Sequence, residues 1–128
     1  MCPVYINRIA SIHAESRNEK PYFSAQEPDY KEMITNANLR RRMSRMIKMG
    51  VACGLECLKD IPSEKVDAII TATGLGCLAD TEKFMNALMD NREQMLNPTA
   101  FIQSTFNTVG AQLALLLKIH AYNITYVH

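Results

Sequence analysis

The end of the chain constrains the possible folds more than any other part of the sequence. The segment Asn107–His120 is apolar on nearly every side of the helix that its spacing predicts, and a helix of that kind lies inside a protein rather than on its surface. It is followed by Asn123–Val127, which is rich in β-branched and aromatic residues, as is typical of a strand. A buried helix that leads into a strand predicts a layered α/β domain.

Two further segments continue this alternation. Asp67–Thr73 is a short apolar run that predicts a strand with both faces covered, and Gly74–Gly76 predicts a turn after it. Ala37–Lys59 has apolar residues at three- and four-residue spacing, which predicts one helix. Gly50 and Gly54 lie on its apolar side, so we expect another element to pack closely there.

The remaining segments are less regular. Val4–Ile6 and Ile9–His13 have short β-like patterns, whereas Glu15–Lys31 is polar and predicts a long loop. A further helix is expected to begin at Asp80 as its N-cap, and Pro98 predicts a break in the chain.

Length and composition set the class of protein. The 128 residues suit one domain over residues 1–128. A net charge of +1 and the absence of tryptophan argue against nucleic acid as a partner. The longest apolar run, Leu113–Leu117, is far shorter than the roughly 20 residues of a membrane span. Because the N-terminus has no apolar signal segment, we expect a cytoplasmic protein with free thiols.

The glycine turn offers one candidate ligand site. Gly74–Ala79 follows a predicted strand and fits the G-x-G-x-x-A form of a dinucleotide-binding loop. Such a unit also needs a second strand about 20 residues further on that ends in an acidic residue, but the segment around Asp90–Glu93 is polar and not strand-like. The alternative is a tight strand-to-helix turn, which we favour, so no cofactor is expected.

The cysteines offer two weaker candidates. Cys53 and Cys57 are four residues apart on a predicted helix and could share a metal ion, but a tetrahedral site needs two more ligands. Cys77 follows the glycine turn at a helix start, where the thiol pKa can be lowered. No base accompanies it, and we expect buried structural cysteines, no metal and no catalytic residue in this chain.

Three stretches together resemble a known family. Arg42–Leu58 is similar to its Arg-Met-Asp-Arg helix, Asp67–Asp80 to its strand and "GTGxGG" turn, and Asn97–Val127 to its Pro-x-x-Phe…Asn helix and closing strand. In this order and spacing they resemble the N-terminal part of a β-ketoacyl synthase, a condensing enzyme of fatty-acid and polyketide synthesis. Gln103–Gly110 is closest to a divergent bacterial branch associated with polyene pigments, such as aryl polyenes, or with resorcinols.

The resemblance implies a thiolase-like α-β-α architecture, of which this chain would form the N-terminal half with a mixed sheet. It also implies a homodimer, or a heterodimer with a ketosynthase, in which the strand at Asn123–Val127 pairs across the two-fold axis. Phe106 and Asn107 match positions that line the family's acyl tunnel. Four basic residues are candidates for contact with an acyl carrier protein, although a solvated helix face is the simpler interpretation: Arg40, Arg41, Arg42 and Arg45.

In the family, the closing strand leads to the nucleophilic cysteine. By this alignment the sequence stops just before that position, and neither its cysteines nor His128 match the catalytic residues. Tyr126 and Val127 stand where the family has small residues. We therefore expect this chain alone to be inactive. The alternatives are a non-catalytic subunit akin to a chain-length factor, a module that docks the carrier protein and, more remotely, a nucleotide-binding module.

The expected strand edge and apolar helix also bear on assembly. An open edge and an uncovered apolar surface favour self-association. We therefore predict a dimer or larger assembly in solution.

Overall fold

A computed structural model of the chain describes residues 3–14 and 24–128. The first half of the chain contributes four helical elements: α1 (Tyr30–Met33), α2 (Ala37–Arg42), α3 (Arg45–Cys57) and the 3-10 helix η1 (Ser63–Lys65). The second half alternates between strands and helices: β1 (Ala68–Thr73), α4 (Leu78–Asp90), α5 (Pro98–Ser104), α6 (Thr108–Leu117) and β2 (Tyr122–Val127).

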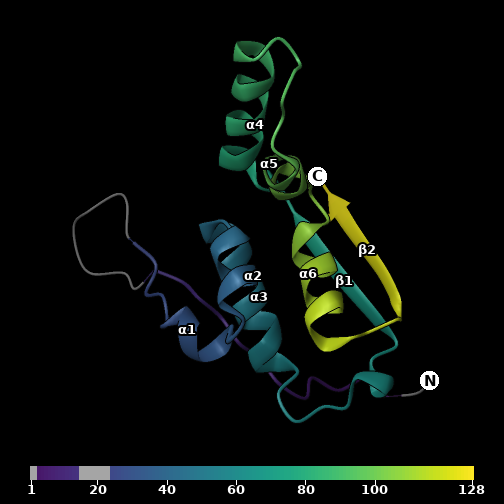
Figure 1. Cartoon of the computed structure of the whole chain (residues 1–128). Coiled ribbons are helices and arrows are strands. Elements are labelled where there is room, and N and C mark those ends of the chain that lie inside the picture. Colours follow the sequence, from purple (N-terminus) through teal and green to yellow (C-terminus); the bar gives the residue numbers. More distant parts are fainter. Residues whose placement is uncertain (1–2, 15–23) are drawn as a thin grey trace.

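The two strands form a parallel pair, and α4, α5 and α6 make the connection between them (Figure 1). The register runs from Ala68 opposite Tyr122 to Thr73 opposite Val127. A parallel pair needs a crossover of this kind, so the α/β class is confirmed. In the part of the chain that the structure describes, the sheet contains only these two parallel strands, so the mixed sheet expected from the resemblance is not formed within it.

Within the described residues, only one face of the sheet is covered. Ile69 lies on the face against α6 and is 8% exposed, whereas its neighbour Ile70 points to the opposite face and is 66% exposed. The prediction that this strand is covered on both faces is therefore wrong. The apolar run correctly indicated two faces that favour burial, but helix α6 covers only one of them in this chain.

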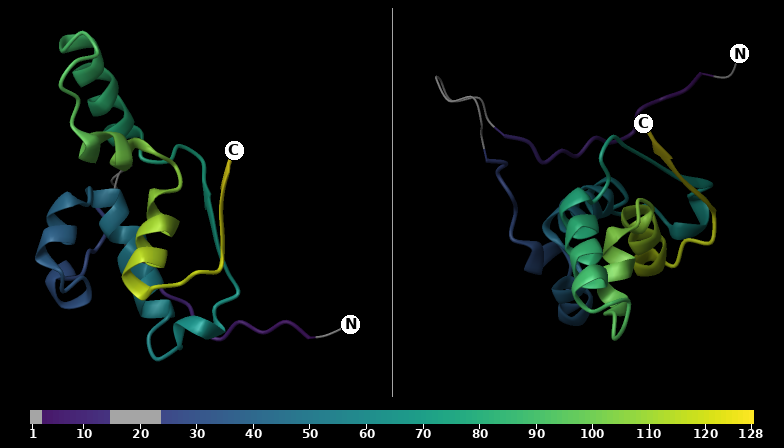
Figure 2. Two further views of the ribbon diagram at one scale, coloured as in Figure 1. Left: turned by 45° about the vertical axis from the view of Figure 1, so that its right-hand side comes forward. Right: turned by 90° about the horizontal axis from the view of Figure 1, so that it is seen from above.

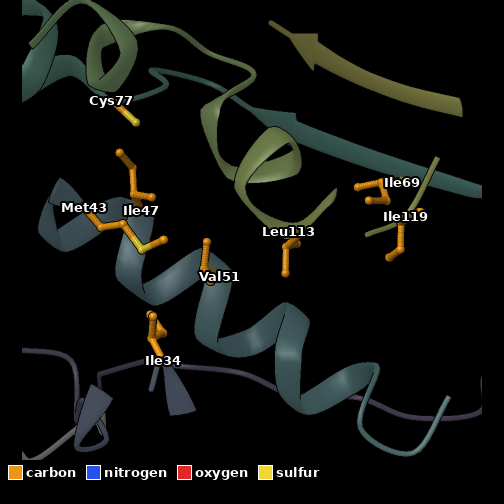
Figure 3. Packing of buried hydrophobic residues seen from close by; sticks show 8 residues of the cluster. All are labelled: Ile34, Met43, Ile47, Val51, Ile69, Cys77, Leu113 and Ile119. Atoms are coloured by element: carbon orange, nitrogen blue, oxygen red, sulfur yellow. The ribbon is translucent and has the colours of Figure 1, made fainter. Parts of the chain in front are cut away.

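The hydrophobic core lies between α3, α6 and β1 (Figure 3). A Cβ atom added at Gly50 would lie 2.7 Å from Cγ1 of Val109, and one added at Gly54 would lie 2.5 Å from Cδ1 of Leu113. The two glycines therefore allow the backbones of α3 and α6 to approach each other, which confirms the close packing predicted from their position. The buried cluster comprises Ile34, Met43, Ile47, Val51, Ile69, Cys77, Leu113 and Ile119.

The helix predicted over Ala37–Lys59 is instead two helices. α2 is capped by Asn36, whose side chain accepts hydrogen bonds from the N–H groups of Asn38 and Leu39 at 3.0 and 3.1 Å. The backbone then becomes extended at Met43 before α3 begins. This break carries Met43 into the core, where it is buried, so tertiary packing overrides the local helical pattern.

The strands predicted near the N-terminus are also wrong. Residues 3–13 have no regular secondary structure and pair with no described strand, and only an isolated bridge joins Ala14 to Ala25. Without a neighbouring strand the β-like pattern has no backbone partner. Arg8 holds this segment to the end of α3 by donating hydrogen bonds to the carbonyl oxygens of Lys59 and Glu56 at 2.6 and 3.3 Å. The predicted long loop falls partly outside the described residues, and α1 begins within it at Tyr30.

Helix α4 begins earlier than expected. Its N-cap is Cys77, whose carbonyl oxygen accepts hydrogen bonds from the N–H groups of Asp80 and Thr81, both at 2.9 Å. Asp80 therefore lies in the first turn and is not the N-cap. A carboxylate is favourable at either place because the N-terminus of a helix carries partial positive charge.

The predicted break at Pro98 is in fact the start of α5. Asn97 caps this helix by accepting a hydrogen bond from the N–H of Thr99 at 2.9 Å, and proline occupies the first turn, where it is tolerated. α4 and α5 form an arm that extends from the rest of the molecule (Figure 2). The rings of Phe84 and Phe101 join the two helices, with centroids 5.6 Å apart.

The described part of the chain has no single helix long and apolar enough to cross a membrane. α5 and α6 reach that length only together, and they are bent by 108° relative to each other.

Candidate functional site

A mainly apolar cavity of about 330 Å³ lies beneath the glycine turn, between α3, β1 and α6. Its volume is near the lower end of the range of roughly 300–1,000 Å³ that is common for small-molecule sites. Polar groups are few, and the hydroxyl oxygens of Thr71 and Thr125 lie 2.6 Å apart in its wall. The lining residues are Met46, Gly50, Thr71, Ala72, Thr73, Gly76, Cys77, Phe106, Val109, Leu113 and Thr125.

Gly76 and Phe106 fix the shape of one end of this cavity. Gly76 has a φ of +59° and donates its N–H to the hydroxyl oxygen of Thr73 at 2.8 Å. A Cβ atom at this position would lie 2.1 Å from Cδ1 of Phe106. Glycine is therefore required both for the left-handed backbone conformation and for the space that the phenyl ring takes.

The same geometry weighs against a dinucleotide-binding loop. The ring of Phe106 lies against the turn at Gly76, and the amide of Gly76 is already hydrogen-bonded within the protein. The residues that follow α4 form turns and then α5, where a dinucleotide-binding unit requires its second strand. The motif is a tight strand-to-helix turn.

The two residues expected to line an acyl tunnel are placed differently. Phe106 lines the cavity and is 48% exposed. Asn107 is the N-cap of α6, makes no side-chain capping hydrogen bond, is exposed and is not in the cavity wall. Sequence reasoning missed Thr71 and Thr125. They could be found from the parallel register, which places them opposite each other, once the two strands were known to be neighbours.

The four arginines do not form one uniform face. The guanidinium group of Arg40 donates hydrogen bonds to the carbonyl oxygens of Ile34 and Thr35, the latter at 3.5 Å. Arg45 is paired with Glu27. Arg41 and Arg42 are exposed, and their side chains form no hydrogen bond or ion pair with the described residues.

The contact of Arg45 is part of a small clasp around Glu27. Nε of Arg45 donates to Oε1 of Glu27 at 2.5 Å, and the hydroxyl of Tyr30 donates to Oε2 at 2.7 Å. The hydrogen bond from Tyr30, and then that from Arg45, lowers the pKa of Glu27. Burial, and then the hydrogen bond to Glu27, raises the pKa of Tyr30.

Two of the described cysteines, Cys53 and Cys77, show no sign of activation. Cys77 is buried at the start of α4, and burial, followed by the charge of Asp80, raises its pKa. The hypothesis of a lowered pKa is therefore wrong, because desolvation disfavours the thiolate. Burial and the neighbouring Cys57 raise the pKa of Cys53. Over residues 3–14 and 24–128, no three metal-binding side chains form a cluster that could hold an ion.

The fold agrees with what similarity to known proteins shows. Residues 13–124 match the family described as "Beta-ketoacyl synthase, N-terminal domain", and the chain belongs to this family. Among solved structures, it is similar to a ketosynthase (ApeO) in complex with its chain length factor (ApeC) from Xenorhabdus doucetiae, with a TM-score of 0.62 and 23% identity. That likeness establishes the thiolase-like fold. A comparison with curated proteins found no match.

The similarity covers 83% of this chain and 41% of the ketosynthase chain. The chain therefore spans less than half the length of that protein.

Proposed function

We propose that the chain is the N-terminal portion of a 3-oxoacyl-[acyl-carrier-protein] synthase-like protein, folded as one domain over residues 1–128. The protein takes part in fatty-acid or polyketide-type synthesis in the cytoplasm, and aryl polyene synthesis is one such pathway. The observation that carries this proposal is the apolar cavity between β1, α6 and the Gly76 turn, in a chain whose family is that of the condensing enzymes. Phe106 contacts one part of a bound acyl chain there.

A condensing reaction needs an activated thiol, a base and oxyanion donors. Cys53 and Cys77 have raised thiol pKa values, and Cys77 is buried. Cys2 lies outside the described residues. We propose that these 128 residues provide scaffold and cavity wall, and that the reacting groups come from another part of the assembly.

The carrier protein, an acidic partner, docks at the exposed arginines in this proposal. Arg41 and Arg42 carry the contact, because their guanidinium groups are not engaged with described residues. Arg40 instead ties α2 to the segment before it. Arg45 contributes less to carrier-protein binding, because its guanidinium group is paired with Glu27.

A second candidate is a non-catalytic subunit akin to a chain-length factor. Tyr126 and Val127, at the end of β2, are large and exposed, and bulky residues there leave little room for a nucleophile. In such a complex the chain pairs with a ketosynthase, either as a heterodimer or within a larger assembly. The strand edge of β2 away from β1 is open for pairing in the described structure.

Binding of a purified holo-acyl carrier protein to the full chain, measured by calorimetry, tests the proposed contact. The double variant Arg41→Glu/Arg42→Glu should weaken binding about tenfold at low ionic strength, because two attractions become repulsions. Lys65→Glu, an exposed change on η1, is the control and should leave the affinity unchanged. Equal affinity for the wild type and the double variant would contradict docking at these arginines.

Intact-mass spectrometry after incubation with an acyl-carrier protein thioester tests the chemistry. We expect no acyl adduct on the chain alone. An adduct on any of its cysteines would show that the chain carries its own nucleophile, contrary to the proposal.

A further inference from the structure

The strongest unassigned feature of the molecule is the contact between Glu27 and Arg45. Arg45 is the first residue of α3, and Glu27 lies on the segment before α1. Both carboxylate oxygens of Glu27 are used, one by Arg45 at 2.5 Å and the other by Tyr30 at 2.7 Å. The side chain of Glu27 is 24% exposed and that of Arg45 is 65% exposed, so the pair sits at the surface where a partner can reach it.

The start of α3 needs a negative charge that the helix itself does not provide. Its first turn has no acidic residue, and Ser44, the N-cap, makes no side-chain capping hydrogen bond. A cation such as Arg45 is unfavourable at this end of a helix, whereas a carboxylate nearby is favourable. Glu27 therefore meets a local electrostatic need, and a carboxylate from another molecule would meet the same need.

Glu27 lies beside cations of α3 that follow the proposed docking residues in the chain. Arg42 precedes Arg45 by three residues, so their Cα atoms are at most about 11 Å apart, which is close to the screening length in physiological salt. Lys48, one turn further along α3, also interacts with the charge of Glu27. An acidic partner that docks at Arg42 and reaches Arg45 consequently meets the carboxylate of Glu27.

We propose that Glu27 acts as an autoinhibitory contact: it occupies Arg45 and weakens docking of an acidic carrier protein at the neighbouring arginines. The proposal rests on the proposed function, because it assumes docking at Arg41 and Arg42. A bound partner takes Arg45 by exchanging its own carboxylate for that of Glu27. Exposed ion pairs contribute little to stability, so this exchange is accessible.

The test is the affinity of the full chain for a purified holo-acyl carrier protein at low ionic strength. Glu27→Gln should tighten binding about twofold to fivefold, because it frees Arg45 and removes a repulsive charge. Tyr30→Phe keeps the net charge but loosens Glu27, and should tighten binding by a smaller factor. Glu64→Gln makes the same charge change on η1 and should have no effect.

A double-mutant cycle separates the contact from a general effect of charge. In an Arg45→Gln background, Glu27→Gln should tighten binding by a smaller factor than in the wild type, because no arginine is freed and only the removal of the repulsive charge remains. Unchanged or weaker binding by Glu27→Gln, with binding still lost on Arg41→Glu/Arg42→Glu, would overturn the autoinhibitory contact and leave the proposed function standing. Insensitivity to all of these changes would overturn both.

Discussion

One face of the β1–β2 sheet packs against α6, whereas the other is open to solvent, and the open face is the more apolar of the two. Pairs on the covered face include Thr71 with Thr125 and Ile69 with Asn123. The open face carries only alanine, isoleucine and tyrosine: Ala68, Ile70, Ala72, Tyr122, Ile124 and Tyr126. Parallel strands are normally buried on both faces. The open face therefore has the composition of a buried face, although no element of the described structure covers it.

Two neighbouring isoleucines give the sharpest test of this comparison. Ile69→Ala should reduce the free energy of unfolding by about 2–5 kcal/mol, as expected for a buried side chain. Ile70→Ala, on the open face, should change it by less than about 0.5 kcal/mol at concentrations where the chain is monomeric. Chemical denaturation of the two variants measures both. A large loss for Ile70→Ala would show that this face is covered in solution.

The second prediction concerns the expected assembly. If copies of the chain associate through the open face, Tyr126→Lys should weaken the dimer about tenfold or more, because a charge in an apolar interface is costly. Light scattering over a range of concentrations measures this. Ser63→Lys on η1 is the matched control. A wild-type chain that stays monomeric at all concentrations would contradict the predicted self-association.

Gly76 tests the covered side of the sheet. Gly76→Ala should reduce stability by about 1–2 kcal/mol, because its left-handed backbone disfavours a side chain and Phe106 occupies the space. In a Phe106→Ala background the steric part should disappear and the loss should be smaller. Thermal unfolding of the single and double variants measures the difference. Identical losses in both backgrounds would show that the ring does not contact the turn.

The smallest expected effect is the pH dependence of the clasp around Glu27. The pKa of Glu27 is lowered. Its contribution to the free energy of unfolding is therefore present above the usual carboxyl range and is lost as the pH falls through the lowered pKa. The pKa of Tyr30 is raised. Its contribution to the free energy of unfolding is therefore complete below the usual tyrosine range and is lost as the pH rises through the raised pKa. Urea midpoints measured against pH should therefore fall at both ends.

Two variants show which residues cause the fall in the urea midpoint at acidic pH (the acidic limb) and at alkaline pH (the alkaline limb). Glu27→Gln should flatten the acidic limb, and Tyr30→Phe should reduce the alkaline one. The raised pKa values of Cys53 and Cys77 add to the alkaline limb, so Tyr30→Phe should not remove it completely. An acidic limb unchanged by Glu27→Gln would show that other carboxylates cause it.

Much of the fold could be predicted from local patterns. The apolar periodicity identified α6 and most of α3, and Gly50 and Gly54 correctly indicated a close helix contact. The predictions were wrong where a segment has no neighbouring element to pair with, or where packing in the core overrides the local pattern. The segment 3–13 has a β-like pattern but no strand beside it, and the helix expected over Ala37–Lys59 is broken so that Met43 can enter the core.

The candidate site could be predicted only in part. Phe106 was identified through resemblance and does line the cavity, but Asn107 is exposed at the start of α6 and is not in the cavity wall. The arginine cluster appeared uniform in the sequence, whereas the structure engages Arg40 and Arg45 and leaves Arg41 and Arg42 exposed. Partners such as Glu27 lie far from Arg45 in the chain, so spacing alone could not reveal them.

By itself, the sequence determined the alternation of helices and strands after Asp67 and the tight turn at Gly74–Gly76, because these depend on periodicity and glycine within a few residues. It also indicated the family, through the order and spacing of three stretches. Only the tertiary structure decided which face of the sheet is covered, which threonines share the cavity wall and which arginine Glu27 holds. Those features depend on contacts between residues distant in the chain, and such contacts exist only once α6 has carried β2 back beside β1.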